Sequence, residues 1–148
     1  MTEKIYDTTK IAKLVRQQIK KEIPGCKFSA TSSWFGGGSE ITVSLMAAPF
    51  LVFAQDVDCN GNVQDKGYAQ LNHYQLRDGF DYDSQDPGIC NGVFLTPEAW
   101  EVLKRADEIA NLHNWDNSDR QTDYWDVNYY FSIQIGKWNK PFQIKERS

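Results

Sequence analysis

The sequence contains no apolar run that approaches the roughly 20 residues of a membrane-spanning helix. Its first ten residues, MTEKIYDTTK, also lack the apolar core of a signal peptide. We therefore expect a cytoplasmic protein with no membrane partner. No internal repeat, linker or low-complexity block interrupts the 148 residues, which is a length typical of one domain. The expected organisation is a single domain, residues 1–148.

Cysteine and histidine are scarce. Cys26, Cys59 and Cys90 are odd in number and widely spaced, whereas a disulfide framework uses an even and denser set. His73 and His113 have no neighbouring Cys or His that would complete a zinc-binding pair. Cys90 lies between glycines, but no nearby His or Lys would lower the pKa of its thiol. We expect reduced structural thiols and partly buried histidines, with no catalytic residue, metal or cofactor.

Charge is unevenly distributed along the chain. Residues 1–28 contain seven Lys/Arg and three Asp/Glu, whereas residues 56–126 contain five Lys/Arg and fifteen Asp/Glu. The N-terminal segment is therefore basic, and the middle of the chain is strongly acidic. Phosphate groups would be attracted to the first part and repelled by the second.

The N-terminal third predicts a helix followed by two strands. Asp7 or Thr8 can cap a helix that runs to about Ile23 and ends at Pro24-Gly25. Its apolar residues recur at helical spacing, and basic residues occupy the opposite side: Lys10, Lys13, Arg16 and Lys20. A strand near residues 26–33, a glycine-rich turn at residues 36–38 and the alternating stretch SEITVSL follow. These glycines join two strands, so a phosphate-binding loop is not indicated.

The stretch DVDCNGNVQDKG, residues 56–67, has two interpretations. Asn60-Gly61 suits a type I′ hairpin turn, which would pair Phe53 with Tyr68, Val52 with Ala69, and Phe50 with Leu71. The alternative is a calcium-binding loop that begins at Asp56. Its twelfth position should be glutamate but is Gly67, and no clear helix precedes it. We therefore predict the hairpin, and a weak surface cation remains the alternative.

The second half predicts one helix and one strand between polar loops. Residues 72–93 have no clear periodicity, which indicates a long loop. Thr96 and Pro97 begin a helix whose buried stripe contains Trp100, Leu103, Ala106 and Ala110, with Val102, Ile109 and His113 beside it. A strand near residues 127–136 places Tyr129, Phe131, Ile133 and Ile135 on one face. The expected fold is α+β: a mostly antiparallel sheet of about five strands with two packed helices, in the order α-β-β-β-β-α-β.

Two surfaces are candidates for partner binding. The first is the loop RDGFDYDSQDPG, which alternates carboxylates with aromatic rings: Asp78, Phe80, Asp81, Tyr82, Asp83 and Asp86. It could contact a basic protein, hold a hard cation or only be solvated. The second is the basic side of the N-terminal helix, which could contact nucleic acid or an acidic protein, or only be solvated. Trp34 and Phe35 would then be stacking groups for bases.

The stretch IAKLVRQQIKKEIPGCKFSATSSWFGGGSEITVSL, residues 11–45, resembles a domain found in large polyvalent proteins of phages and conjugative elements, the twenty-ninth of that series. The shared pattern is the basic helix, Pro24-Gly25, the strand at residues 27–29, the glycine-rich turn and the strand of Ile41 and Val43. The resemblance implies an α+β fold carried on mobile DNA, and it implies no catalytic residues.

Two functional hypotheses follow. The first is a non-catalytic mobile-element protein that binds a basic host protein, such as a defence nuclease or another nucleic-acid-processing complex, through the acidic aromatic loop. The second is a small nucleic-acid-binding module that uses the basic helix. The oligomeric state is left open.

Overall fold

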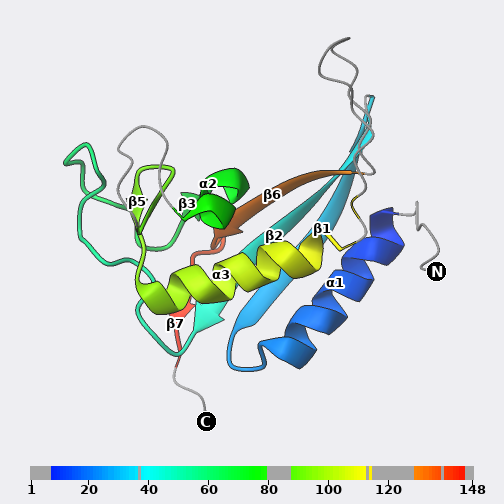
Figure 1. Ribbon diagram of the computed structural model, residues 1–148, viewed down its shortest axis with the longest axis horizontal. Coiled ribbons are helices and arrows are strands. Elements are labelled where there is room, and N and C mark those ends of the chain that lie inside the picture. Colours follow the sequence, from blue (N-terminus) through cyan, green and yellow to red (C-terminus); the bar gives the residue numbers. More distant parts are fainter. Residues whose placement is uncertain are drawn as a thin grey trace.

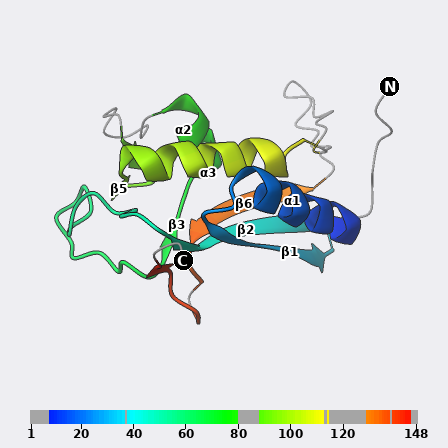
Figure 2. The same ribbon diagram turned by 90° about the horizontal axis from the view of Figure 1, so that it is seen from below.

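The computed structural model describes residues 8–36, 38–79, 88–112, 114, 129–137 and 139–145. Helices α1 (Thr8–Glu22) and α3 (Pro97–Ala110) lie on one face of a sheet, and the short helix α2 (His73–Asp78) lies beside α3 (Figures 1 and 2). The predicted α+β class and the sheet of about five strands are confirmed. None of the helices in these ranges has the length and apolarity needed to span a membrane.

The sheet is built around one long strand. Strand β2 (Gly38–Ala48) pairs antiparallel with β1 (Lys27–Phe35) and parallel with β6 (Tyr130–Ile135). The short β3 (Ala69–Gln70) pairs antiparallel with β6, and β7 (Gln143–Ile144) pairs parallel with the end of β2. Strands β4 (Ile89–Cys90) and β5 (Val93–Phe94) form a separate two-stranded sheet. The central strand is therefore paired along both sides, as a buried strand requires.

Helix α1 forms where the apolar spacing predicts it. Ile11, Val15 and Ile19 are buried, and the four basic residues of the opposite side are exposed: Lys10, Lys13, Arg16 and Lys20. At the start of the helix the hydroxyls of Thr8 and Ser39 are 2.6 Å apart and buried. This contact ties α1 to the beginning of β2. Asp7, the other predicted cap, lies outside the described residues.

The hydrophobic core lies between the helices and the sheet. Ile41, Val43 and Leu45 alternate along β2 and are fully buried, as the sequence predicts. Ile133 and Ile135 of β6 and Leu103 of α3 complete the same cluster. Because β2 and β6 are parallel neighbours, their alternating apolar residues face the helices together.

Helix α3 begins as predicted. The Thr96 side chain accepts a hydrogen bond from the amide of Ala99 at 3.2 Å, and Pro97 occupies the first helical position. Leu103 is fully buried, whereas Trp100 is only partly buried and donates its indole N–H to the carbonyl of Leu76 at 3.1 Å. This bond fixes α2 against α3. His113, predicted beside the stripe, lies outside the described residues.

The predicted pairing of residues 50–53 with residues 68–71 is wrong. Phe53 instead bridges to Leu95, and Ala69 pairs with Ile135. The amide of Phe142 donates to the carbonyl of Gly67 at 2.7 Å, which holds the start of the second segment beside the residue that precedes β7. A distant strand therefore replaces the local partner. Apolar residues pair well with either one, so local pattern alone does not choose between them.

The tip of this segment is a hairpin turn, but its type differs from the prediction. Val57 bridges Val63, the carbonyl of Asp58 accepts from the Gly61 amide at 3.0 Å, and Gly61 has a φ of +83°. A type I′ turn also needs a positive φ at Asn60, which this residue lacks. The pattern fits a three-residue loop with its last residue in the left-handed region.

The calcium alternative for this loop finds no support in the geometry of its carboxylates. One oxygen of Asp58 accepts backbone amides of Asn60 and Asn62 at 2.9 and 3.0 Å. The Asp56 carboxylate is paired with Lys66, which lowers its pKa. In the described parts of the chain, no three His, Cys, Asp or Glu side chains are grouped as a metal site would require.

The prediction of a structureless loop at residues 72–93 is also wrong for residues 73–78, 89–90 and 93, whereas residues 80–87 lie outside the described part of the chain. Asn72 caps the N-terminus of α2, where its side chain accepts hydrogen bonds from the amides of Tyr74 and Gln75 at 3.0 and 3.2 Å, and Gly79 caps the C-terminus. A helix of six residues is too short to display a repeating apolar pattern. Strands β4 and β5 contain two residues each, so they are also too short to show an alternating apolar pattern.

Candidate functional site

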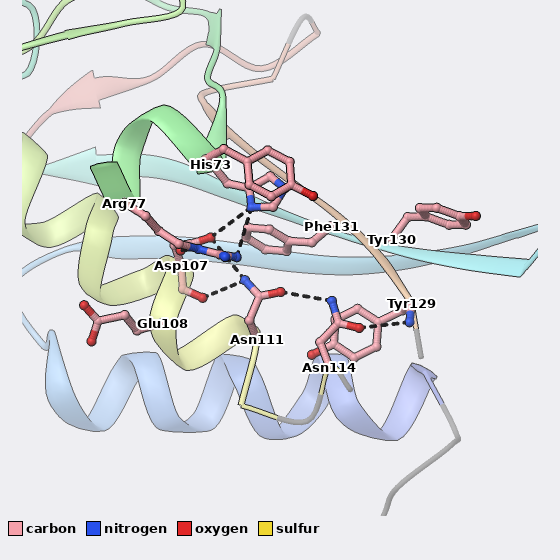
Figure 3. Close-up of a pocket in the computed structure, with 10 residues that line it drawn as sticks. His73, Arg77, Asp107, Glu108, Asn111, Asn114, Tyr129, Tyr130 and Phe131 are labelled. Atoms are coloured by element: carbon pink, nitrogen blue, oxygen red, sulfur yellow. Dashed lines mark hydrogen bonds and ion pairs between the residues drawn. The ribbon is translucent and has the colours of Figure 1, made fainter. Parts of the chain in front are cut away.

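A pocket of about 560 Å³ lies between α2, the C-terminal part of α3 and the start of β6. Helix α2 contributes His73, Tyr74 and Arg77, and strand β6 contributes Tyr130 and Phe131 (Figure 3). The remaining lining residues come from α3 and the segments beside it: Asp107, Glu108, Asn111, Asn114 and Tyr129. The pocket thus collects side chains that are far apart in the sequence.

The pocket contains an ion pair between a buried carboxylate and a partly exposed guanidinium. Asp107 is fully buried, and its Oδ2 accepts a hydrogen bond from Nε of Arg77 at 2.9 Å. Burial raises the pKa of the Asp107 carboxyl, and the neighbouring Arg77 guanidinium acts in the opposite direction. Asn111 donates to the other oxygen of Asp107 at 3.1 Å and to its backbone carbonyl at 2.8 Å. The carboxylate is therefore hydrogen-bonded at both oxygens.

His73 is held in its neutral form. Its burial, together with the charge of Arg77, lowers its pKa to about 4. Nη2 of Arg77 lies 3.1 Å from Nδ1 of His73, so the guanidinium donates and the imidazole accepts. Nδ1 also lies 3.7 Å from Asp107 Oδ1, but a neutral ring forms no ion pair there. The ring packs against Tyr74 and meets the edge of Phe131, with centroids 4.0 and 5.4 Å away.

A chain of hydrogen bonds connects this ion pair to β6. Asn114 donates to Asn111 Oδ1 at 3.0 Å, and the Tyr129 amide donates to Asn114 Oδ1 at 3.2 Å (Figure 3). The buried Tyr129 hydroxyl donates to the carbonyl of Ala110 at 2.5 Å. Residues 114 and 129 are thus held together, although fourteen residues separate them in the sequence.

The rim of the pocket is aromatic. Tyr74 and Tyr130 have exposed fractions of 58% and 45%, which are large for aromatic side chains. Glu108 also lines the pocket, and one of its oxygens is 3.0 Å from the Arg105 guanidinium. Exposed aromatic rings above a neutralised ion pair suit binding better than proton transfer. A histidine with a pKa near 4 is also a weak base at neutral pH.

The acidic aromatic loop predicted from the sequence is described only at its start. Asp78, the last residue of α2, is exposed. The other predicted contacts, Phe80, Asp81, Tyr82, Asp83 and Asp86, lie outside the described residues. Asp78 follows directly after Arg77 of the pocket, so this loop begins at the end of the helix that carries Arg77 and His73.

The residues of the nucleic-acid alternative lie elsewhere. The four basic residues of α1 are exposed, and Trp34 near the end of β1 has an exposed fraction of 62%. Phe35 ends β1, and its side chain lies outside the described part of the structure. Helix α3 separates α1 from α2 (Figure 1). The basic side of α1 and the pocket residues of α2 are therefore separated by α3.

Pocket residues such as Arg77, Asp107, Asn111 and Tyr130 were not predicted as site residues from the sequence. One signal was present, because Asp107 lies four residues after Leu103 and three before Ala110, within the apolar stripe of α3. A carboxylate on a buried helical face needs a partner. Its partner Arg77 is thirty residues away, in a segment that shows no periodicity, so the pair could not be assigned from spacing.

The cysteines have different environments. Cys90 is buried, and its thiol donates to the carbonyl of Asn72 at 3.3 Å, consistent with a structural role. Burial raises the pKa of the Cys26 thiol. Cys59 is exposed beside the turn at residues 58–62, so burial does not extend to all three thiols.

Comparison with known proteins identifies one family. No curated protein and no solved structure gives a significant match to the chain. Residues 6–87, more than half of the chain, match the family described as large polyvalent protein associated domain 29. This segment extends well beyond residues 11–45, on which the resemblance in the sequence rests, and it includes α1, β1, β2, β3 and α2. The chain therefore belongs to the large polyvalent protein associated domain 29 family, whose members accompany the polyvalent proteins of mobile elements.

Proposed function

We propose that this protein is a non-catalytic mobile-element protein that binds a basic surface of a host protein at the aromatic rim of the pocket. The partner in this proposal is a nucleic-acid-processing protein such as a defence nuclease, because proteins of that class present basic surfaces. Binding would then compete with nucleic acid for the same surface.

The observation that carries the proposal is the exposure of Tyr74 and Tyr130 around a pocket whose cation is already neutralised. Arg77 is held by Asp107, so it does not oppose an incoming positive charge strongly. Tyrosine is among the residues that contribute most to binding energy in protein interfaces. A lysine or arginine of the partner could lie over an exposed ring and gain a cation–π interaction.

The charge of the chain near the pocket supports the same partner. Residues 80–87, which follow α2, contain three Asp and no Lys or Arg. Residues 115–128, which join Asn114 to Tyr129, contain four Asp and one Arg. Both segments connect to elements that line the pocket. Negative charge of this density speeds the encounter with a basic protein by electrostatic steering.

The test compares charge variants of the acidic aromatic loop. A partner is first recovered from the native host by pull-down and purified, and its association rate is measured at low and high ionic strength. Changing Asp78, Asp81, Asp83 and Asp86 to Asn should slow association by about tenfold at low salt and weaken its salt dependence. Thermal stability should change little.

A matched control addresses net charge alone. The variant Glu98→Gln, Glu101→Gln removes two exposed carboxylates of α3, and it is compared with Asp81→Asn, Asp83→Asn. The proposal expects a slower association only for the second variant. Equal effects would indicate a general charge effect, and unchanged binding by the fourfold variant would exclude the loop as a contact surface.

The second candidate function is nucleic-acid binding by α1. The exposure of Lys10, Lys13, Arg16 and Lys20 along one side of the helix favours it, together with the exposed Trp34. Binding of the unmodified protein to duplex DNA or RNA, with a steep dependence on salt, would support this candidate over the first.

A further inference from the structure

Strand β1 forms a long edge of the sheet. Strand β1 spans nine residues and pairs with β2, and no other described strand pairs with it. After Lys27, the residues FSATSSWF contain no charge and no proline. Proteins normally shield an edge strand by making it short or by placing charges or proline in it. At the opposite edge, β3 has only two residues.

Helix α1 lies above this edge. It packs mainly on β1 rather than on β2, and the two run antiparallel at similar lengths, about 21 Å for the helix and about 26 Å for the strand (Figure 2). On one flank α1 meets α3, through Leu14, Gln18 and a 2.5 Å contact between Glu22 and Arg105. The other flank of α1 therefore faces the open side of β1.

That open flank is basic. From helical spacing, Lys13, Arg16 and Lys20 lie on the side of α1 opposite Leu14 and Gln18. All three are exposed, and none has a carboxylate partner among the described residues. Their positions differ by about 4.5 and 6 Å along the helix axis. Alternate residues of a strand, which point to the same face, are about 6.6 Å apart.

We propose that β1 accepts an additional strand from an acidic segment of a partner protein, a surface separate from the pocket of the proposed function. The backbone of the segment would pair with β1, and its helix-side carboxylates would lie beneath Lys13, Arg16 and Lys20. In strand addition of this kind, main-chain hydrogen bonds provide the affinity and alternate side chains provide the specificity. The basic flank selects acidic residues at those alternate positions.

The probe is a blocked peptide of about eight alternating Thr and Glu residues, long enough to cover most of β1. Binding is followed by the amide shifts of the ¹⁵N-labelled full chain. The expected result is binding with the largest shifts in residues 27–35. A peptide of the same length with Lys in place of Glu should not bind. The peptide with alternate backbone amides N-methylated should lose binding, because one edge of its backbone can no longer donate.

Two variants separate the basic flank from overall charge. Arg16→Gln with Lys20→Gln should weaken binding of the Thr-Glu peptide by about tenfold, because two exposed charge pairs are lost and each contributes modestly to affinity. Lys21→Gln, on the same helix but away from the edge, is the matched control and should leave affinity unchanged. All three side chains are exposed, so folding should be retained, and circular dichroism verifies this.

Several results would overturn the proposal. Equal affinity of the N-methylated peptide would mean that charge alone attracts it. Shifts centred on the pocket rather than on β1 would assign the peptide to another surface. Displacement of the peptide by a short single-stranded DNA, with tighter binding of the DNA, would assign the basic flank to nucleic acid. Sedimentation showing a dimer that the β1 variant Thr31→Pro dissociates would identify a second copy of the chain as the occupant.

Discussion

Arg77 and Asp107, thirty positions apart in the sequence, join helices α2 and α3: Nε of Arg77 donates to Oδ2 of a fully buried Asp107 at 2.9 Å. The pair lies at the centre of a network that continues through Asn111 and Asn114 to the backbone of Tyr129. Because α2 is only six residues long, it cannot be stable alone. The ion pair and the Trp100 indole bond to Leu76 are two polar contacts that hold it against α3.

We therefore expect Arg77→Ala to lower the free energy of unfolding by about 2 kcal/mol at pH 7, because it leaves a buried carboxylate without its cation. The measurement is chemical denaturation. Arg105→Ala, which removes an exposed cation paired with Glu22 and Glu108, is the control and should cost less. Equal losses would mean that the Arg77 pair has no more structural importance than a surface contact.

The second prediction concerns the interface between α3 and the sheet. Leu103 is fully buried in the core that also contains Ile133. Leu103→Ala should reduce the free energy of unfolding by roughly 2–5 kcal/mol through lost burial and a residual cavity. Leu112→Ala provides the comparison, because Leu112 is exposed just beyond the same helix. If both variants have wild-type stability, the assignment of the buried face of α3 is wrong.

Elements with their own periodicity could be predicted from the sequence. The apolar positions of α1, β2 and α3 repeat with the period of their structure, and each faces the core as expected. Thr96 and Pro97 begin α3 as the capping rules predict. These elements also determine the α+β class, because two amphipathic helices need one apolar face of a sheet.

Strand partners could not be predicted in the same way. Phe53 and Ala69 are apolar residues on either side of a good turn, and local rules pair the two segments with each other. In the structure Ala69 pairs with Ile135 and Phe53 pairs with Leu95, and both partners lie far along the chain. Close packing at Gly136 fixes this arrangement, since a Cβ there would lie 1.9 Å from the carbonyl oxygen of Gly67. Such an approach leaves no periodic signal.

The residues that line the candidate site were not predicted as site residues from the sequence. Asp78 marks the loop that the sequence singles out, and this residue follows the pocket residue Arg77 directly. The polar network itself depends on pairs such as Arg77–Asp107 and Asn114–Tyr129, which tertiary packing brings together. A charged residue within an apolar stripe indicates that a partner exists, but it does not identify that partner.

The third prediction tests the turn at residues 58–62. Gly61 has a φ of +83°, a conformation that β-branched residues strongly disfavour. Gly61→Val should therefore cost on the order of 1 kcal/mol or more in the free energy of unfolding. Gly61→Asn should cost less, because asparagine tolerates the left-handed region. A Cβ added at Gly61 would have no heavy atom within 4 Å. The difference between the valine and asparagine variants therefore measures backbone conformation and not steric overlap. Two variants of equal stability would contradict the assigned turn.

The last prediction concerns pH. The pKa of His73 falls from 6.5 to about 4 on folding, because the ring is partly buried beside Arg77. The unfolded chain therefore binds a proton at this residue at a higher pH than the native protein does. Stability from neutral His73 is fully present above about pH 6.5 and is lost as the pH falls towards 4. The loss amounts to at most about 3 kcal/mol, from the size of the shift.

Asp107 works in the opposite direction and must be separated from His73. Its pKa is raised by burial, so its protonation at low pH relieves the cost of the buried charge. His73→Gln removes the titrating ring, retains a hydrogen-bond acceptor for Arg77 and leaves Asp107 in place. Unfolding free energies of the wild type and this variant are measured from pH 7 to pH 4. The wild type should lose more stability than the variant across this window, and parallel curves would show that His73 titrates normally in the folded protein.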